Sequence, residues 1–307
     1  MSFIKNRKIF FIIAAILGLA SIASLLVFGL KPGIDFTGGS IMEVEYKDAR
    51  PQAADINSRL HDLKLGELSL QTVGEKGVML RMKELDENIH QQILSRLSDN
   101  PNGQPIAFVE KRFESIGSVV GKELKDKTAT LAVLSLLLIV AYIAIAFRKV
   151  AQPCRSWQYG LVSLVTLFYD VLLPLAVFAV LGKFYSVEIS IPVIIALLTV
   201  IGYTINDKVV VFDRIRENLL RGAGASFQEI VGISIKQTLT RSINTSFTVI
   251  VSLTALLVFG GDTLKYFSLA LLIGVIVGTC SSIFLAGPML VSWVGWRERR
   301  RAGKRKR

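Results

Sequence analysis

The chain has 307 residues, 51% of them hydrophobic, and a formal net charge of +12 at pH 7. Its mean hydropathy is +0.51 and its apolar residues are gathered in blocks, a pattern that excludes an ordinary soluble globular protein. Six blocks approach the length of about 20 residues that a transmembrane helix needs. The sequence therefore predicts an α-helical polytopic membrane protein with six transmembrane helices, at Ile9–Leu30, Thr128–Phe147, Tyr159–Leu181, Ile189–Asp207, Arg241–Gly260 and Tyr266–Val294.

The first span follows Lys5, Arg7 and Lys8, an arrangement that a secretory signal peptide would share. The span is longer than the roughly 7–15 residues of a signal-peptide core, and no convincing A-x-A cleavage site closes it. We therefore expect residues 1–30 to hold a cytoplasmic N-terminus and an uncleaved membrane anchor.

The next stretch, KPGIDFTGGS at 31–40, combines a proline with three glycines. Pro32 and Gly33 end the helix, and Gly38 and Gly39 allow positive φ or a close backbone approach. A phosphate-binding loop is the alternative, but no G-x-G-x-x-G motif and no following helix start are present. A structural turn is the favoured interpretation.

Residues 31–127 form an extracytoplasmic α+β domain in our interpretation. A strand at 40–46, a helix at 51–63, a hairpin at 68–83, a helix at 84–97 and a strand at 105–113 follow one another. This β-α-β-β-α-β order predicts a ferredoxin-like fold. No catalytic constellation is visible, so a binding or scaffolding domain is expected.

Histidine and cysteine positions argue against metal and disulfide chemistry. Cys154 falls in a predicted cytoplasmic loop and Cys280 in the sixth span, so they are not expected to pair. His61 and His90 have no Cys or acidic cluster at ligand spacing. We expect both histidines to be solvated surface residues, and no metal site.

Three charged residues fall within or at the ends of spans, where each costs about 2.5–3.5 kcal/mol on insertion scales. Asp170 lies near the middle of the third span, Asp207 ends the fourth, and Arg241 begins the fifth. A short side chain at mid-span cannot reach either membrane surface, so Asp170 is a functional candidate together with the other two.

Helical spacing gives the fourth and fifth spans one polar stripe each. Because the two stripes end in opposite charges on the same side of the membrane, we expect an Asp207–Arg241 ion pair. The alternative is that Arg241 snorkels to the interface and Asp207 lies in headgroup water. The stripe residues are Thr199, Tyr203, Asn206 and Asp207 in the fourth span and Arg241, Asn244, Thr245, Thr248 and Ser252 in the fifth.

The sixth span contains GVIVG at 274–278, with Ser282 four residues further on, a small-residue row that permits close helix packing. A basic tail, RERRRAGKRKR, follows at 297–307. Segments on one side of the spans hold three, three, six and eight Lys or Arg residues, whereas the short loops opposite hold only Lys183 and Lys265. The positive-inside rule puts both termini in the cytoplasm, with helices 2–6 at 128–296. The net charge then reflects topology and contact with the anionic lipid bilayer rather than nucleic-acid binding.

Four stretches together resemble the SecF family, membrane subunits of the bacterial Sec protein-export machinery. They are GIDFTGG at 33–39, IGYTINDKVVVFDRIREN at 201–218, TLTRSINTS at 238–246 and IGVIVGTCSSIFLAGP at 273–288. The resemblance covers nearly the whole chain and implies an inner-membrane subunit of the SecD/SecF family, within the RND superfamily, that is not an enzyme. It implies pairing with SecD and use of the proton-motive force to drive late steps of export of unfolded polypeptide through SecYEG. Protons would be the coupling ion, with no cofactor.

The resemblance also assigns residues. Asp207 and Arg241 match family positions implicated in proton conduction, and we add Asp170 to this proton relay, although Tyr169-Asp170 stands where some members have His-Asp. Lys208 departs from the family, because a small Ser or Thr is expected beside the aspartate. Motif positions with an expected structural role are Gly33, Asp35, Gly38, Gly39, Asp213 and Arg214, with Arg216 beside them.

Two other functions remain open at this point. An RND-like small-molecule exporter half would need a large apolar pocket, and a passive translocon assembly scaffold would use the intramembrane charges only for packing. A hydrolytic enzyme is not favoured, because no nucleophile–base pair and no Walker-type loop are present.

Overall fold

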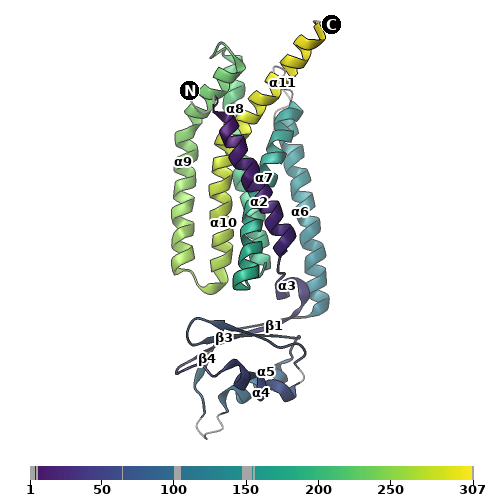
Figure 1. The fold of residues 1–307 in the computed structure, drawn as a ribbon, viewed down its shortest axis with the longest axis vertical. Helices are drawn as coiled ribbons and strands as arrows, with labels where there is room; N and C mark the ends of the chain where they lie inside the picture. Colours follow the sequence, from purple (N-terminus) through teal and green to yellow (C-terminus); the bar gives the residue numbers. More distant parts are fainter. Residues whose placement is uncertain are drawn as a thin grey trace. The chain divides into compact units, whose positions relative to one another are not determined.

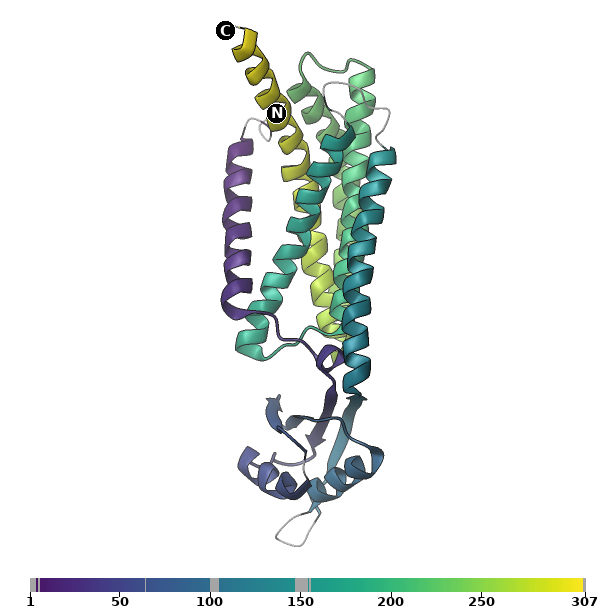
Figure 2. The same cartoon turned by 90° about the vertical axis from the view of Figure 1, so that its right-hand side faces the viewer.

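The computed structural model describes residues 4, 6–63, 65–99, 105–146, 154 and 156–305. The chain divides into two compact units, a membrane unit formed by Met1–Lys31 with Leu131–Arg307 and an outer unit formed by Pro32–Thr130. Figures 1 and 2 show a helical bundle and a small sheet covered by helices. The two units are described separately below.

The helices long and apolar enough to span a membrane number six within the described residues, which confirms the predicted spans. The sixth span is continuous from α10 through a π-helical segment, η2, into α11. The elements are α2 (Arg7–Phe28), α6 (Ser118–Ala146), α7 (Ser156–Tyr185), α8 (Ile191–Leu220), α9 (Phe227–Phe259), α10 (Asp262–Ser281), η2 (Ser282–Ala286) and α11 (Gly287–Arg305).

The fifth helix begins earlier than predicted, at Phe227 instead of Arg241. Its start is capped: the Ser226 hydroxyl accepts a hydrogen bond from the Glu229 amide at 3.2 Å, while the Glu229 carboxylate accepts one from the Ala225 amide at 3.0 Å. This reciprocal arrangement satisfies amide groups that a helix start leaves free. Hydrophobicity alone locates the membrane-spanning part of a helix, whereas the residue at which the helix begins is set by such caps.

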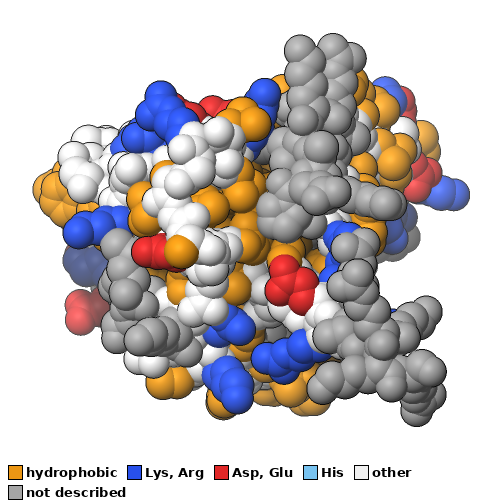
Figure 3. All heavy atoms as spheres, turned by 90° about the horizontal axis from the view of Figure 1, so that it is seen from above, with side chains coloured by type: hydrophobic (Ala, Val, Ile, Leu, Met, Phe, Trp, Pro, Cys, Tyr) orange, Lys and Arg blue, Asp and Glu red, His pale blue; other side chains and the backbone are white. Residues whose placement is uncertain are grey.

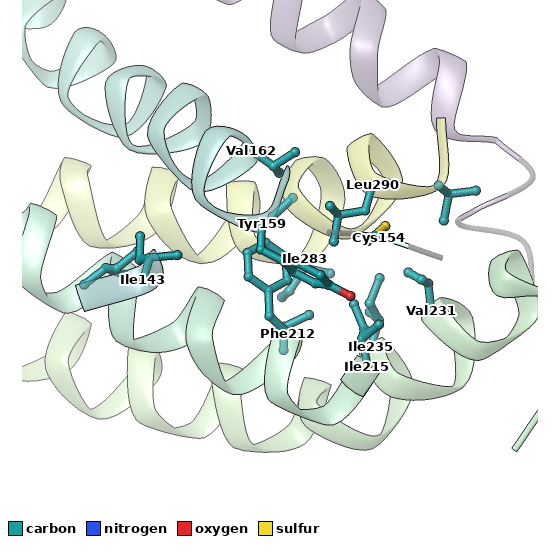
Figure 4. Close-up of a cluster of buried hydrophobic side chains, with 14 of the residues drawn as sticks. Ile143, Cys154, Tyr159, Val162, Phe212, Ile215, Val231, Ile235, Ile283 and Leu290 are labelled. Atoms are coloured by element: carbon teal, nitrogen blue, oxygen red, sulfur yellow. The ribbon is translucent and has the colours of Figure 1, made fainter. Parts of the chain in front are cut away.

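The core of the membrane unit gathers apolar side chains from α7, α8, α9 and the last span. Tyr159 and Phe212 are fully buried and meet edge to face, with ring centroids 5.2 Å apart. Figure 4 shows Ile235, Ile283 and Leu290 in the same cluster, together with Cys154. Burial raises the pKa of the Cys154 thiol to about 12, so this cysteine is protonated at neutral pH.

The outer unit is a four-stranded antiparallel sheet in the order β2-β3-β1-β4, with two helices in the β-α-β-β-α-β sequence. This confirms the ferredoxin-like prediction. Met42 in β1 pairs with Leu80 in β3 and Phe113 in β4, and the central strand is almost entirely buried. The elements are β1 (Gly39–Tyr46), α4 (Ala53–Leu60), η1 (His61–Leu63), β2 (Ser69–Val73), β3 (Gly77–Met82), α5 (Glu87–Ser98) and β4 (Phe108–Ile116).

One histidine prediction is wrong. His61 is exposed, but His90 is buried: it stacks on Phe113 at 3.8 Å between ring centroids and its Nε2 lies 2.8 Å from a Glu110 carboxylate oxygen. His90 lies three residues before Ile93 and seven before Leu97, on the face of α5 that packs against the sheet. Its polar ring is accommodated there because Glu110 satisfies one nitrogen.

The glycine turn between the first span and β1 contains a four-residue helix, α3 (Ile34–Thr37). Gly38 and Gly39 follow it with φ of 72° and 120°, values that favour glycine. A Cβ atom on Gly38 would lie 2.7 Å from the Ser118 Cα, and one on Gly121 would lie 2.9 Å from the Gly38 nitrogen. The two glycines therefore let this turn pack directly against the start of α6.

Candidate functional site

The membrane unit carries two adjacent ionisable residues on α8 that contact different neighbours. The Lys208 ammonium donates a hydrogen bond to Oδ2 of Asp170 on α7, at 2.5 Å, and both side chains are completely buried. The Asp207 carboxylate, which is half-buried, accepts hydrogen bonds from the hydroxyls of Ser242 on α9 and Ser282 in η2. An ion pair thus joins one face of α8 to α7, and hydroxyl groups join an adjacent face of α8 to α9 and η2.

A second layer of hydroxyls lies one helical turn from Asp207. The Tyr203 hydroxyl donates to Ser246 Oγ at 3.3 Å, and Ser246 Oγ lies 2.6 Å from Thr279 Oγ1. These side chains come from α8, α9 and α10, whereas the groups that hold the Asp207 carboxylate come from α9 and η2. Because hydroxyls both donate and accept, this layer is a second polar contact between the helices, beside the one at Asp207.

Ser282 has a special backbone setting, because it begins the π-helical segment η2. Such segments interrupt the regular α-helix and occur frequently at functional sites. Here the segment lies between α10 and α11 and brings the Ser282 hydroxyl to Asp207. The last span is therefore irregular at the residue that contacts the carboxylate.

Glycines on α10 allow α8 to approach closely, which confirms the predicted role of the small-residue row. A Cβ atom on Gly274 would lie 2.3 Å from Val200 Cγ2, and one on Gly278 would lie 1.9 Å from Thr204 Cγ2. The same position on Gly278 is 3.6 Å from Asp170 Oδ2. Any larger residue at position 278 would displace Thr204 and fill the space beside Asp170.

The predicted Asp207–Arg241 ion pair is wrong for this structure: in the part of the chain that the structure describes, no such pair joins the two residues. Arg241 is exposed, and it borders a cavity of about 410 Å³ with Asp213, Arg214 and Gln237. It precedes Ser242 by one residue, or about 100° around α9. The helix therefore presents the serine to Asp207, and the arginine points elsewhere.

The polar stripe predicted for α9 lies on the exposed side of that helix in this chain. Asn244, Thr245, Thr248 and Ser252 are all exposed, whereas Ser242 and Ser246 are buried. Sequence reasoning missed these two serines, although they share the i, i+4 spacing. The available signal is size, since small side chains are enriched where membrane helices pack closely.

The stripe predicted for α8 divides in the same way. Tyr203 and Asp207 contact the neighbouring helices, as described above, but Thr199 and Asn206 are exposed. The Thr199 hydroxyl donates to the Ile195 carbonyl of its own helix at 2.8 Å. Thr199 and Asn206 therefore do not join the hydroxyl layers.

The family-motif residues at the end of α8 connect it to α9. Arg214 Nε donates to Gln237 at 2.7 Å, Arg214 also pairs with Glu217, and Arg216 lies 3.6 Å from Asp213. Asn218 is buried and donates to Ser234 and Gln237 at 2.8 Å each. The bonds from Arg214 and Asn218 to α9 hold the α8–α9 hairpin together, whereas the Arg214–Glu217 and Arg216–Asp213 pairs lie within α8. Gly33 and Asp35 lie in the turn of the outer unit, the latter within α3.

Comparison with known proteins gives the family. The model of "Protein export membrane protein SecD/SecF, C-terminal" matches residues 100–296, and that of the "SecD/SecF GG Motif" matches residues 23–49. The chain belongs to the SecD/SecF family. Membership makes it a component of protein export and not an enzyme.

Individual relatives agree with this assignment. "Protein translocase subunit SecF" of Thermobaculum terrenum is 41% identical over 94% of this chain and 93% of its own length. The subunit of the same name from Anaerolinea thermophila is 35% identical over 95% of this chain and 94% of its own. The crystal structure of SecDF from Thermus thermophilus superposes with a TM-score of 0.79 and 28% identity over 95% of this chain. This SecF-family chain spans 38% of that SecDF chain.

Proposed function

We propose that this chain works with SecD to couple proton movement to polypeptide export through SecYEG, and that Asp207 takes up and releases the proton. The observation that carries the proposal is the setting of its carboxylate between α8, α9 and η2. Two hydroxyls hold it, and among the described residues no cationic side chain is bonded to it. A hydroxyl can donate to a carboxylate and accept from a carboxylic acid, so this site accommodates both protonation states.

Protonation would change the contact between helices. Hydrogen bonds to an ionised carboxylate are roughly twice as strong as those between neutral groups. A proton on Asp207 therefore weakens the attachment of α9 and η2 to α8. A proton shifts such an equilibrium only as far as its affinities for the two arrangements differ. We infer that the resulting repacking moves the outer unit, which holds the emerging unfolded polypeptide.

We propose that Arg241 acts together with residues of the SecD subunit. Its exposed guanidinium and the exposed polar side chains of α9 would be costly in contact with lipid. A SecD subunit covering this face would shield them and bring its own groups to the Asp207–Arg241 region. The proton relay would then consist of Asp207 and Arg241 from this chain and residues of SecD.

The charge distribution supports an inner-membrane orientation with both termini in the cytoplasm. The start of α2 and the end of α11 lie at the same end of the membrane unit (Figure 1). Figure 3 views that end, where Lys and Arg side chains are spread over the surface. Such clusters remain on the cytoplasmic side during insertion and contact anionic lipid.

The test is export of a secreted reporter in cells that lack the native subunit, with and without a proton gradient. Asp207→Asn, Arg241→Met and the double variant are compared at matched abundance and matched assembly with SecD. Thr199→Val serves as the control, because its hydroxyl contacts only its own helix. We expect the first three variants to lose the gradient-dependent part of export and the control to keep it.

Unchanged export in all variants would contradict the proposal and favour the scaffold function. A small-molecule exporter has one supporting feature, an apolar cavity of about 510 Å³ lined by residues that include Phe11, Tyr169, Trp293 and Trp296. Gradient-driven efflux of a lipophilic dye by the chain with SecD, without reporter export, would favour that function instead.

A further inference from the structure

The Asp170–Lys208 ion pair is a second charged feature of the bundle, and nothing in the proposed proton path requires it. We propose that this pair is a fixed clamp that joins α7 to α8, and that it does not itself carry protons. The proposal rests on the function proposed above. It removes Asp170 from the predicted relay and gives Lys208 a role.

The clamp is enclosed on all sides. Both side chains are completely buried, and Lys208 is among the largest fully buried side chains of the described chain. Thr204 and Gly278 pack beside it, the latter leaving the space that Asp170 Oδ2 borders. A lysine at the centre of a membrane helix normally snorkels to the surface. Lys208 instead bonds to the carboxylate, and the pair as a whole carries no net charge.

A charged pair so enclosed cannot be opened cheaply. Separating it would leave two desolvated charges, a state far more costly than either the pair or its neutral replacement. Oδ1 of Asp170 has no hydrogen-bond partner among the described residues, so Lys208 is the group that compensates this carboxylate. Among the described residues, Tyr169 and Cys280 lie close enough to Asp170 to interact with it electrostatically, and both are neutral in their ordinary forms.

Geometry connects the clamp to Asp207. Consecutive residues on an α-helix point about 100° apart. Lys208 therefore anchors α8 to α7 while Asp207 anchors the same turn to α9 and η2. A rotation of α8 that released Asp207 would also pull Lys208 from its counterion. We infer that α7 and α8 move as one body, and that α9 and the last span shift against them.

A thermodynamic test uses the full chain assembled with SecD. Lys208→Met and Asp170→Asn each leave one buried charge unpaired, whereas the double variant leaves none. We expect both single variants to lose thermal stability and the double variant to recover most of it. The pH profile of gradient-driven export should be the same in the double variant as in the original protein, because Asp207 is untouched.

Two results would contradict the proposal that this pair is a fixed clamp. If the single variants are as stable as the original protein, the pair does not constrain the helices. If the double variant is stable but has lost gradient dependence or has a shifted pH profile, Asp170 belongs to the proton path. Asp207→Asn is measured in parallel: retained gradient dependence there would contradict the proposed function, whereas the stability comparison would still decide whether the pair joins α7 to α8.

Discussion

The two sides of α8 hold their neighbours by different chemistry. Towards α7, a completely buried ammonium meets a completely buried carboxylate. Towards α9 and η2, a half-buried carboxylate meets serine hydroxyls. Opening the first contact would expose two charges, whereas the second changes strength with a single proton. The comparison indicates that α8 can be fixed against α7 while its contact with α9 and η2 responds to protonation.

The largest effect is expected from Gly278, which lies against both Thr204 and Asp170. Gly278→Ala would place a Cβ atom 1.9 Å from Thr204 Cγ2, so α10 must move away from α8. Overpacking of this kind typically costs about 1–3 kcal/mol, and we expect the upper end. Thermal unfolding of the purified complex measures it. Gly202→Ala is the matched control, since nothing lies within 4 Å of its added Cβ; equal stability of the two variants would contradict the packing described here.

The serine hydroxyls that hold the Asp207 carboxylate are tested by Ser242→Ala and Ser282→Ala. Each removes one hydrogen bond to a charged group, an interaction worth about 1.5–3 kcal/mol. We expect gradient-driven export to fall by about tenfold or more in each variant, with gradient-independent export unchanged. Thr245→Val is the control, because its hydroxyl donates to backbone carbonyls of its own helix. A control as impaired as the serine variants would show that the export defect does not come from Asp207.

A smaller effect is expected in the second hydroxyl layer. Tyr203→Phe removes a single neutral hydrogen bond, 3.3 Å long, to Ser246. Such bonds contribute about 0.5–1.5 kcal/mol, so export should fall by no more than about tenfold and the pH profile should keep its shape. Reporter export across a pH series provides the measurement. Loss comparable to that of Asp207→Asn would mean that the tyrosine is an obligatory member of the proton path.

The smallest effect is expected at Cys154. Burial raises the pKa of its thiol to about 12, from an ordinary value of 9.0, so the reactive thiolate is scarce at neutral and mildly alkaline pH. Maleimide labelling of the folded protein at pH 8 should leave Cys154 unmodified, and labelling in denaturant should modify it fully. Peptide mass spectrometry distinguishes it from Cys280. Rapid labelling in the folded protein would contradict the enclosure of the core beside α7.

The sequence predicts the outer unit in more detail than the membrane unit, for a physical reason. In water, polar and apolar positions separate by burial, so alternation and helical periodicity locate the strands and helices of the ferredoxin-like fold. His90 is the exception, because Glu110 and Phe113 make a buried place for an imidazole. In the membrane, both lipid and protein interior accept apolar side chains, so hydropathy locates spans but not their inward faces.

The candidate site shows the same difference. Asp207, Tyr203 and the glycines of α10 were identified correctly as residues of helix contacts, because charge, size and spacing mark them. The predicted inward face of α9 is rotated by about one residue from the observed one. The charge of Arg241 and the amide of Asn244 are stronger polar signals in the sequence than the small hydroxyls of Ser242 and Ser246. The pairing of Lys208 with Asp170 joins residues 38 positions apart, and no local pattern specifies it.

The central claim is that Asp207, and not Asp170, changes protonation during the working cycle. Infrared difference spectroscopy of the complex with SecD in lipid, recorded on acidification, measures the C=O band of protonated carboxyl groups directly. The account predicts a band that disappears in Asp207→Asn and persists in the Asp170→Asn/Lys208→Met double variant. A band that persists in Asp207→Asn and disappears in the double variant would contradict it.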